Sequence, residues 1–203
     1  LAVQCALGLT WIGARHRVTE VLDEAEAAIR PAVDPSAQDT GPAEAAGMLH
    51  LTAALHHAHV GQATDADAHL ERATDLAAHT GEQNTLYHHF GPAHVALWEV
   101  EIAVELGRGP TAVERVAPHA EQVMHTLGST NRRCVFAFDM ARAYAQSDGD
   151  RDTQAVRYLD LSDRTSTQVR NVPVARELLD TLNRRTKRRA WELHSLTNRF
   201  GLT

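Results

Sequence analysis

The chain has 203 residues, of which 43% are hydrophobic and 23% charged, and its formal net charge is −6. These proportions are typical of a globular protein, and the acidic balance disfavours binding of nucleic acid over a broad basic face. No apolar run reaches the roughly 18 residues that a membrane-spanning helix needs, and the two cysteines, Cys5 and Cys134, form no C-x-x-C pair. We therefore expect a cytoplasmic protein without a disulfide framework or a membrane partner.

The opening residues, LAVQCALGLT, contain no initiator methionine and lack the charged region and the cleavage site of a signal peptide. We expect the chain to be a fragment or a processed product of a longer protein.

Nearly every segment is predicted to be helical, because Ala, Leu, Glu, Arg and Gln dominate and no segment alternates as a strand does. Glycine, proline and asparagine breakers separate the Ala-rich runs. In chain order, the predicted helices lie near residues 1–13, 16–30, 43–60, 64–80, 91–106, 111–127, 131–147, 151–166, 173–186 and 188–200. The longest predicted loop, RPAVDPSAQDTGP, covers residues 30–42.

Small residues recur at matched positions in two of the predicted hairpins. Ala66 follows Ala54 by twelve residues, and Ala155 follows Ala143 by the same interval. Further apolar or small residues continue both patterns: Leu70, Ala73, Leu159 and Ser162. Tetratricopeptide repeats have small residues at such positions, which let the two helices of a hairpin approach closely. We therefore predict that all four alanines are buried where paired helices cross.

The repeat pattern predicts the fold class and the organisation of the chain. A degenerate third copy lies between the other two: Val100, Gly107, Ala112, Val116 and His119. We predict an all-α fold, a right-handed superhelical stack of antiparallel helical hairpins, with a generic Ala-rich bundle as the alternative. The stack is expected to be one continuous array. It comprises an N-terminal hairpin and long loop at 1–42, three tetratricopeptide-like hairpins at 43–170 and capping helices at 171–203.

Three segments together resemble a known family. They are FGPAHVALWEVEIAVELG, DMARAYAQSDGDRDTQAVRYLDLSDR and the basic tail LLDTLNRRTKRRAWELHSLTNRFGLT. In this order they resemble the C-terminal tetratricopeptide-like domains of helix-turn-helix (XRE-type) transcriptional regulators of GC-rich Gram-positive bacteria. The resemblance covers roughly residues 46–203, and it departs at Ala93-His94, where family members have Thr-Asn.

The resemblance implies a sensory and dimerisation domain that works as a homodimer. A signal peptide or small molecule would bind in a concave groove, and the change would be relayed to a DNA-binding domain that is absent from this chain. Contact with DNA is then expected only through that upstream domain. The alternative is a constitutive scaffold that holds a protein partner and senses no ligand.

The first helix of a tetratricopeptide hairpin lines the concave side, so one stripe of each such helix supplies candidate ligand-binding residues. The candidates are Met48, Leu51, Leu55, His59, His94, Leu97, Glu101, Arg133, Met140 and Tyr144. Among them, His94 is expected to offer a ligand both a hydrogen-bond donor and an acceptor. The alternative is that a neighbouring helix covers the stripe and that these residues are core.

The thirteen histidines fall in no known metal-ligand spacing. His88 and His89 are predicted to be partly exposed loop residues, and we predict neither a metal site nor a cofactor. A metal site or a pH-responsive cluster is the alternative. Because the sequence has no Gly-rich phosphate loop, nucleophile motif or carboxylate pair in a catalytic context, no enzymatic activity is expected.

Overall fold

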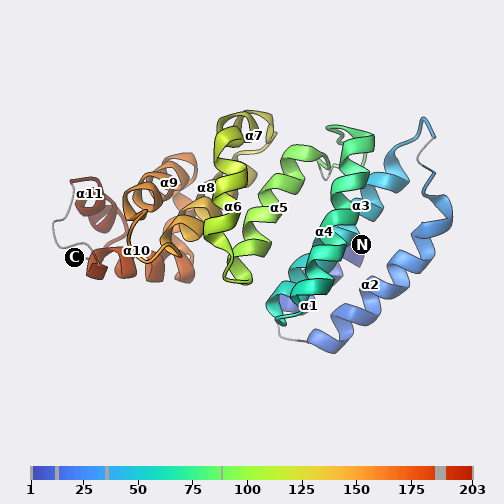
Figure 1. Ribbon diagram of the computed structural model, residues 1–203, viewed down its shortest axis with the longest axis horizontal. Helices are drawn as coiled ribbons and strands as arrows, with labels where there is room; N and C mark the ends of the chain where they lie inside the picture. Colours follow the sequence, from blue (N-terminus) through green and yellow to red (C-terminus); the bar gives the residue numbers. More distant parts are fainter. Residues whose placement is uncertain (1, 12–13, 35–36, 88, 186–190, 203) are drawn as a thin grey trace. The chain divides into compact units, whose positions relative to one another are not determined.

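The computed structural model describes residues 2–11, 14–34, 37–87, 89–185 and 191–202, and within these ranges the protein is all-α, without a strand (Figure 1). The all-α class predicted from the sequence is confirmed. No helix in the described ranges is both long and apolar enough to cross a membrane. The chain divides into two compact units, Leu1–Leu106 and Gly107–Thr203, here called unit 1 and unit 2.

Unit 1 is built around a central helix, α3. Its elements are α1 (Ala2–Trp11), α2 (Arg15–Ile29), the 3-10 turn η1 (Arg30–Ala32), α3 (Gly41–His59), α4 (Ala63–Thr80) and α5 (Pro92–Glu105) (Figure 1). Pro42 and Pro92 lie in the first turns of α3 and α5, where the missing N–H costs no hydrogen bond. Since α3 packs against α1, α2, α4 and α5, its apolar residues are buried around most of its circumference.

Helices α3 and α4 form the first predicted hairpin. The chain reverses at Gly61, whose φ of 76° lies in the left-handed region that glycine adopts without strain. Ala54 and Ala66 are both 0% exposed. Their burial confirms the prediction for the first hairpin.

A buried carboxylate holds the connection between α4 and α5 onto α3. Glu44, in the first turn of α3, is 1% exposed. Its Oε1 accepts a hydrogen bond from Thr40 Oγ1 (2.8 Å), and its Oε2 accepts one from the backbone N–H of Thr85 (3.0 Å). Both oxygens are therefore satisfied, as a buried charge requires.

The end of the same connection is anchored by Phe90. Its ring is fully buried against Gly47 of α3, where an added Cβ would lie only 2.0 Å from a ring atom. Beside it, Glu82 Oε1 accepts a hydrogen bond from the backbone N–H of Ala93 (2.6 Å). This contact satisfies one of the free N–H groups at the start of α5.

Unit 2 begins with a helix that is interrupted. Its elements are α6 (Gly109–Val116), η2 (Ala117–His119), α7 (Ala120–Thr126), α8 (Thr130–Ala145), α9 (Asp152–Thr165), η3 (Thr167–Asn171), α10 (Pro173–Arg185) and α11 (Trp191–Arg199). The single helix predicted over 111–127 is wrong, because Pro118 lies within it. Proline lacks an N–H donor and its ring clashes with the carbonyl one turn earlier, so the helix tightens into η2 before α7 begins.

Helices α8 and α9 form the second hairpin with matched alanines. Ala143 and Ala155 are both 0% exposed, which confirms the prediction there. The start of α6 also packs closely on α8, because a Cβ added to Gly109 would lie 2.7 Å from the Cα of Ala143. The backbone N–H of Gly109 donates to Gln146 Oε1 (2.8 Å) at the end of α8.

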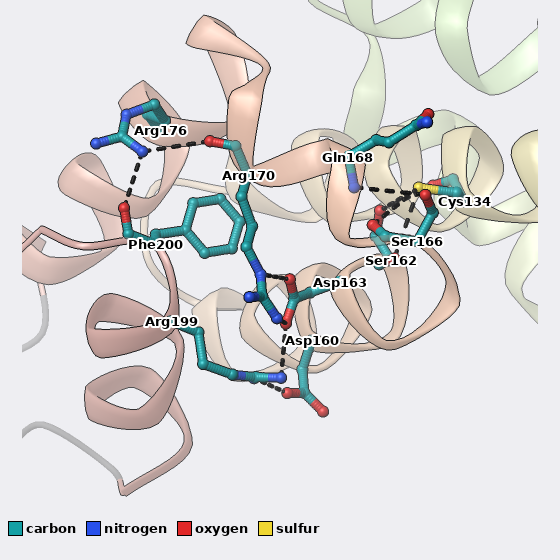
Figure 2. A network of polar contacts seen from close by, with 10 residues as sticks. All are labelled: Cys134, Asp160, Ser162, Asp163, Ser166, Gln168, Arg170, Arg176, Arg199 and Phe200. Carbon is teal, nitrogen blue, oxygen red and sulfur yellow. Dashed lines mark hydrogen bonds and ion pairs between the residues drawn. The ribbon is translucent and has the colours of Figure 1, made fainter.

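A buried aspartate ties the C-terminal elements of unit 2 together (Figure 2). The side chain of Asp163 in α9 is 0% exposed. Arg170 of η3 donates to both of its oxygens (2.5 and 3.1 Å), and Arg199 of α11 lies 2.6 Å from its Oδ2. Arg199 also donates to Asp160, one turn earlier in α9. The hydrogen bond to Asp163 raises the pKa of Arg170.

Other polar contacts in Figure 2 join α10 and α8 to their neighbours in unit 2. Arg176 of α10 donates from Nη1 to the backbone carbonyls of Arg170 (3.2 Å) and Phe200 (2.8 Å). Between α8 and α9, Ser162 Oγ donates to the carbonyl of Cys134 (2.9 Å). Ser162 is fully buried, in keeping with its place in the predicted repeat pattern.

Substitution of Ala66 or Ala155 by leucine is expected to lower the free energy of unfolding by about 1–3 kcal/mol, because the added carbons overpack the helix crossing. Chemical denaturation monitored by circular dichroism measures the loss. Ala68→Leu is the matched control, since Ala68 is exposed on α4. Equal stability of the three variants would contradict close packing at the alanines.

Substitution of Asp163 by alanine is expected to lower the free energy of unfolding by about 3 kcal/mol, because two arginines lose a buried partner. Asp180→Ala is the control: Asp180 pairs with Arg184 at 3.2 Å on the surface, and such a pair contributes about 0–1 kcal/mol. The two denaturation midpoints should therefore differ clearly. A loss at Asp163 no larger than the loss at Asp180 would show that the network does not hold unit 2 together.

Candidate functional site

The four apolar residues that were predicted to line a groove in unit 1 are core residues. Met48, Leu51 and Leu55 are 4%, 0% and 6% exposed, and Leu97 of α5 is also buried. Helices α1, α2, α4 and α5 pack around α3, so these side chains present almost no surface to a ligand. The prediction of an open groove along this stripe is wrong for these four residues, because a stripe of Met and Leu serves equally well as helix-packing surface.

His94 also differs from the expectation. It is 3% exposed, and its Nε2 accepts a hydrogen bond from Trp98 Nε1 (2.7 Å) one turn later in α5. The indole N–H has only a donor to offer, so this contact assigns the proton of a neutral His94 to Nδ1. The imidazole is therefore part of the packed interior and is not presented to a ligand.

The other predicted site residues are divided between the two units. In unit 1, His59 is exposed with its Nε2 3.5 Å from Glu105 Oε2, and Glu101 is half-buried. In unit 2, Arg133 is half-buried, whereas Met140 is 0% exposed and in the core. Tyr144 is buried and stacks on the ring of Tyr158, with 5.4 Å between centroids. Burial raises the pKa of Tyr144.

Of the two loop histidines, His88 lies outside the described residues. His89 is half-buried with a φ of 51°, and its backbone N–H donates to Asn84 Oδ1 (3.0 Å).

The structure instead brings together three other side chains of unit 1, here called the histidine cluster: Glu26 of α2, His50 of α3 and His69 of α4. Nδ1 of His50 lies 3.0 Å from Nδ1 of His69, and 3.9 Å from Glu26 Oε2. One potential ligand atom from each residue lies within 4.8 Å of the other two. Two imidazoles and a carboxylate are ligand types that zinc accepts.

Further histidines surround the cluster. The ring of His57 stacks on His69, with centroids 5.3 Å apart and planes 12° from parallel, and its Nδ1 lies 2.7 Å from Gln62 Oε1. His56 Nε2 lies 3.2 Å from Thr19 Oγ1. These contacts hold the rings around His69 in defined orientations.

The environment favours the neutral form of both cluster histidines. Burial lowers the pKa of His50, against the opposing effect of Glu26. The pKa of His69 falls to about 4, chiefly through burial and then through the nearby His50, His57 and Arg72. Each neutral ring has one nitrogen with a free lone pair and one N–H. The 3.0 Å contact between the two Nδ1 atoms is then a hydrogen bond in which one ring donates and the other accepts.

The cluster can be reached from solvent. An open pocket of about 250 Å³ is lined by Glu26, His50 and Arg72, with Ile29, Val33 and Leu76 among its apolar walls. On the other flank a cavity of about 10 Å³, bordered by His56, His57 and His69, has room for about one water molecule.

Sequence reasoning missed this cluster because its members come from three helices. The sequence nevertheless contained a signal for the pairing of His50 with His69. If Ala54 faces Ala66 in an antiparallel hairpin, then His50, one turn before Ala54, faces His69, about one turn after Ala66. The approach of Glu26 depends on how α2 docks onto this hairpin, and no spacing in the sequence indicates that.

Unit 2 has a larger pocket, of about 520 Å³, between the α8–α9 turn and α11. Its charged lining residues are Asp148, Asp152, Arg157, Arg185 and Glu192. Both signs are present, and Arg185 is already engaged, donating to the carbonyl of Ala145 (2.7 Å) and lying 3.7 Å from Asp152 Oδ1. The lining therefore selects neither an anion nor a cation.

Comparison of the chain with models of protein families, with curated proteins and with solved structures finds no match.

The metal-free protein is expected to lose stability as the pH falls from 6.5 towards 4. The pKa of His69 is about 4 in the folded chain against an ordinary value of 6.5, so between these values the unfolded chain binds a proton that the folded chain does not. The contribution to stability is therefore complete above pH 6.5 and is lost on acidification.

Chemical denaturation in the presence of EDTA at pH 7.5 and pH 5.0 measures this loss. His69→Gln should show a smaller loss than the wild type, whereas His79→Gln, at an exposed position of α4, should match the wild type. The same pH dependence in His69→Gln and in the wild type would contradict the assignment to His69.

Proposed function

We propose that the chain is a tetratricopeptide-like binding module, the sensory and dimerisation domain of a cytoplasmic helix-turn-helix transcriptional regulator. In this proposal its hairpins form a right-handed superhelical stack, and the signal is a peptide or a small molecule. The role is one of binding and not of catalysis, and DNA is contacted only through a domain upstream of residue 1.

The observation that carries this proposal is the pair of matched hairpins. In both α3–α4 and α8–α9, alanines twelve residues apart are completely buried where the helices pack. One helical bundle has no reason to repeat the same small residues at the same interval, whereas a repeat protein does. The order of the segments FGPAHVALWEVEIAVELG, which contains α5, and DMARAYAQSDGD, which supplies the C-terminal part of α8, adds the resemblance to the regulators.

One observation favours the alternative of a constitutive scaffold. The apolar residues expected to line a ligand groove in unit 1, together with His94, are enclosed by the unit's own helices. A module whose interior is filled by its own side chains can hold a protein partner on its outer surface without a small ligand. The scaffold is therefore the second candidate function.

A longer form of the protein, in which the proposed DNA-binding domain precedes Leu1, provides the test. Genomic DNA fragments from the source organism are incubated with that protein and with the 203-residue chain at physiological salt, and the retained fragments are sequenced. The longer protein is expected to enrich defined sites. The 203-residue chain, with a net charge of −6, is expected to enrich none.

Sedimentation velocity of the 203-residue chain is expected to show a dimer. Enrichment of defined DNA sites by the 203-residue chain alone would contradict the division of roles between the two parts. A longer protein that enriches no site, together with a monomeric chain, would favour the scaffold.

A further inference from the structure

We propose that Glu26, His50 and His69 form a binding site for a divalent transition-metal ion of the zinc type. The three residues belong to α2, α3 and α4, and the proposal does not depend on the proposed function.

The positions of the ligand atoms fit one small ion. Zinc bonds of about 2.0–2.1 Å in a tetrahedral arrangement place neighbouring ligand atoms about 3.3 Å apart. The two observed separations, 3.0 Å between the Nδ1 atoms and 3.9 Å from His50 Nδ1 to Glu26 Oε2, lie on either side of this value. All three ligand atoms lie within 4.8 Å of one another, so an ion between them requires Glu26, whose side chain is 26% exposed, to move closer to the two imidazoles.

The ligand types select the class of metal. Imidazole nitrogen suits zinc and its first-row neighbours, whereas calcium and magnesium require mainly oxygen ligands. Two histidines and one carboxylate leave a tetrahedral ion with a fourth position for water or for a further ligand. The open pocket of about 250 Å³ beside Glu26 and His50 provides access to that position.

The surroundings hold the ligands in place. Arg30 donates to Glu26 Oε1 (3.3 Å) and leaves Oε2 directed at His50. The stacked ring of His57 restricts His69. His50 is buried one helical turn from the tightly packed Ala54, so its position is set by the α3–α4 crossing. Such outer contacts orient metal ligands, and their loss usually weakens binding 10–100-fold.

Without a metal the same geometry is a hydrogen-bonded histidine pair, which needs one proton between the two Nδ1 atoms. When a metal ion binds, that proton moves to Nε2 of the donor ring, and the ion accepts the lone pairs of both Nδ1 atoms. The bound ion would also connect α2 to the α3–α4 hairpin through its ligands. Metal binding is therefore expected to stabilise the folded chain.

Isothermal titration calorimetry of the EDTA-treated 203-residue chain with ZnCl₂ tests the proposal. We expect saturable binding of one Zn²⁺ per chain, a rise in the melting temperature with Zn²⁺, and no response to MgCl₂. CoCl₂ should give the intense visible absorption of a tetrahedral cobalt ion, which reports coordination directly.

Glu26→Gln and His69→Asn are expected to weaken Zn²⁺ binding at least tenfold and to abolish the rise in melting temperature. His79→Asn and His125→Asn, at exposed positions of α4 and α7, are the matched controls and should bind as the wild type does. Circular dichroism verifies that each variant is folded, and Glu26→Gln retains the size of the side chain, so a loss of binding there is not a loss of fold.

Two results would overturn the proposal. One is the absence of saturable Zn²⁺ binding by the folded wild-type chain. The other is wild-type Zn²⁺ affinity in both folded variants, which would place the binding at other histidines.

Discussion

The close approach of paired helices at alanine is the constraint on which both units depend. At α3–α4 and at α8–α9 a fully buried alanine on each helix lets the backbones come near enough for the larger side chains around them to interlock. In unit 2 the backbone of Gly109 also packs closely against Ala143, where an added Cβ would not fit. In unit 1 the crossing also sets the register that places His50 opposite His69.

Buried carboxylates join the remaining elements to these hairpins. Glu44 accepts hydrogen bonds from Thr40 and Thr85, and Asp163 forms ion pairs with two arginines from separate elements. Apolar packing between helices leaves loops and chain ends weakly held. A buried carboxylate whose oxygens all accept hydrogen bonds adds directional contacts at these places. Replacing it with a side chain that cannot accept these bonds destabilises the fold, because its partners are left buried and unpaired.

The candidate binding site of unit 1 is the histidine cluster beside the α3–α4 hairpin, and not a groove along α3. Met48, Leu51 and Leu55 of α3 are core residues because α1, α2 and α5 cover the side of α3 that α4 leaves free. The histidine cluster remains at the margin of that core, with a neutral imidazole pair, a carboxylate and a pocket open to solvent. A ligand bound at this margin would act on the docking of α2, since Glu26 is the contribution of α2 to the cluster.

The sequence by itself determined the helical class, most helix positions and the two hairpins, because Ala-rich composition, glycine and proline breakers and the Ala54–Ala66 and Ala143–Ala155 intervals all act locally. The prediction of one helix over residues 111–127 was wrong, because Pro118 interrupts the helix despite the helical composition around it. Only the tertiary structure decided whether the stripe of Met48, Leu51 and Leu55 was groove or core, because both uses require the same apolar residues. Only the tertiary structure also decided that Glu26 lies next to His50. Contacts among three helices depend on how the helices dock, and the spacing of residues along the sequence does not indicate this.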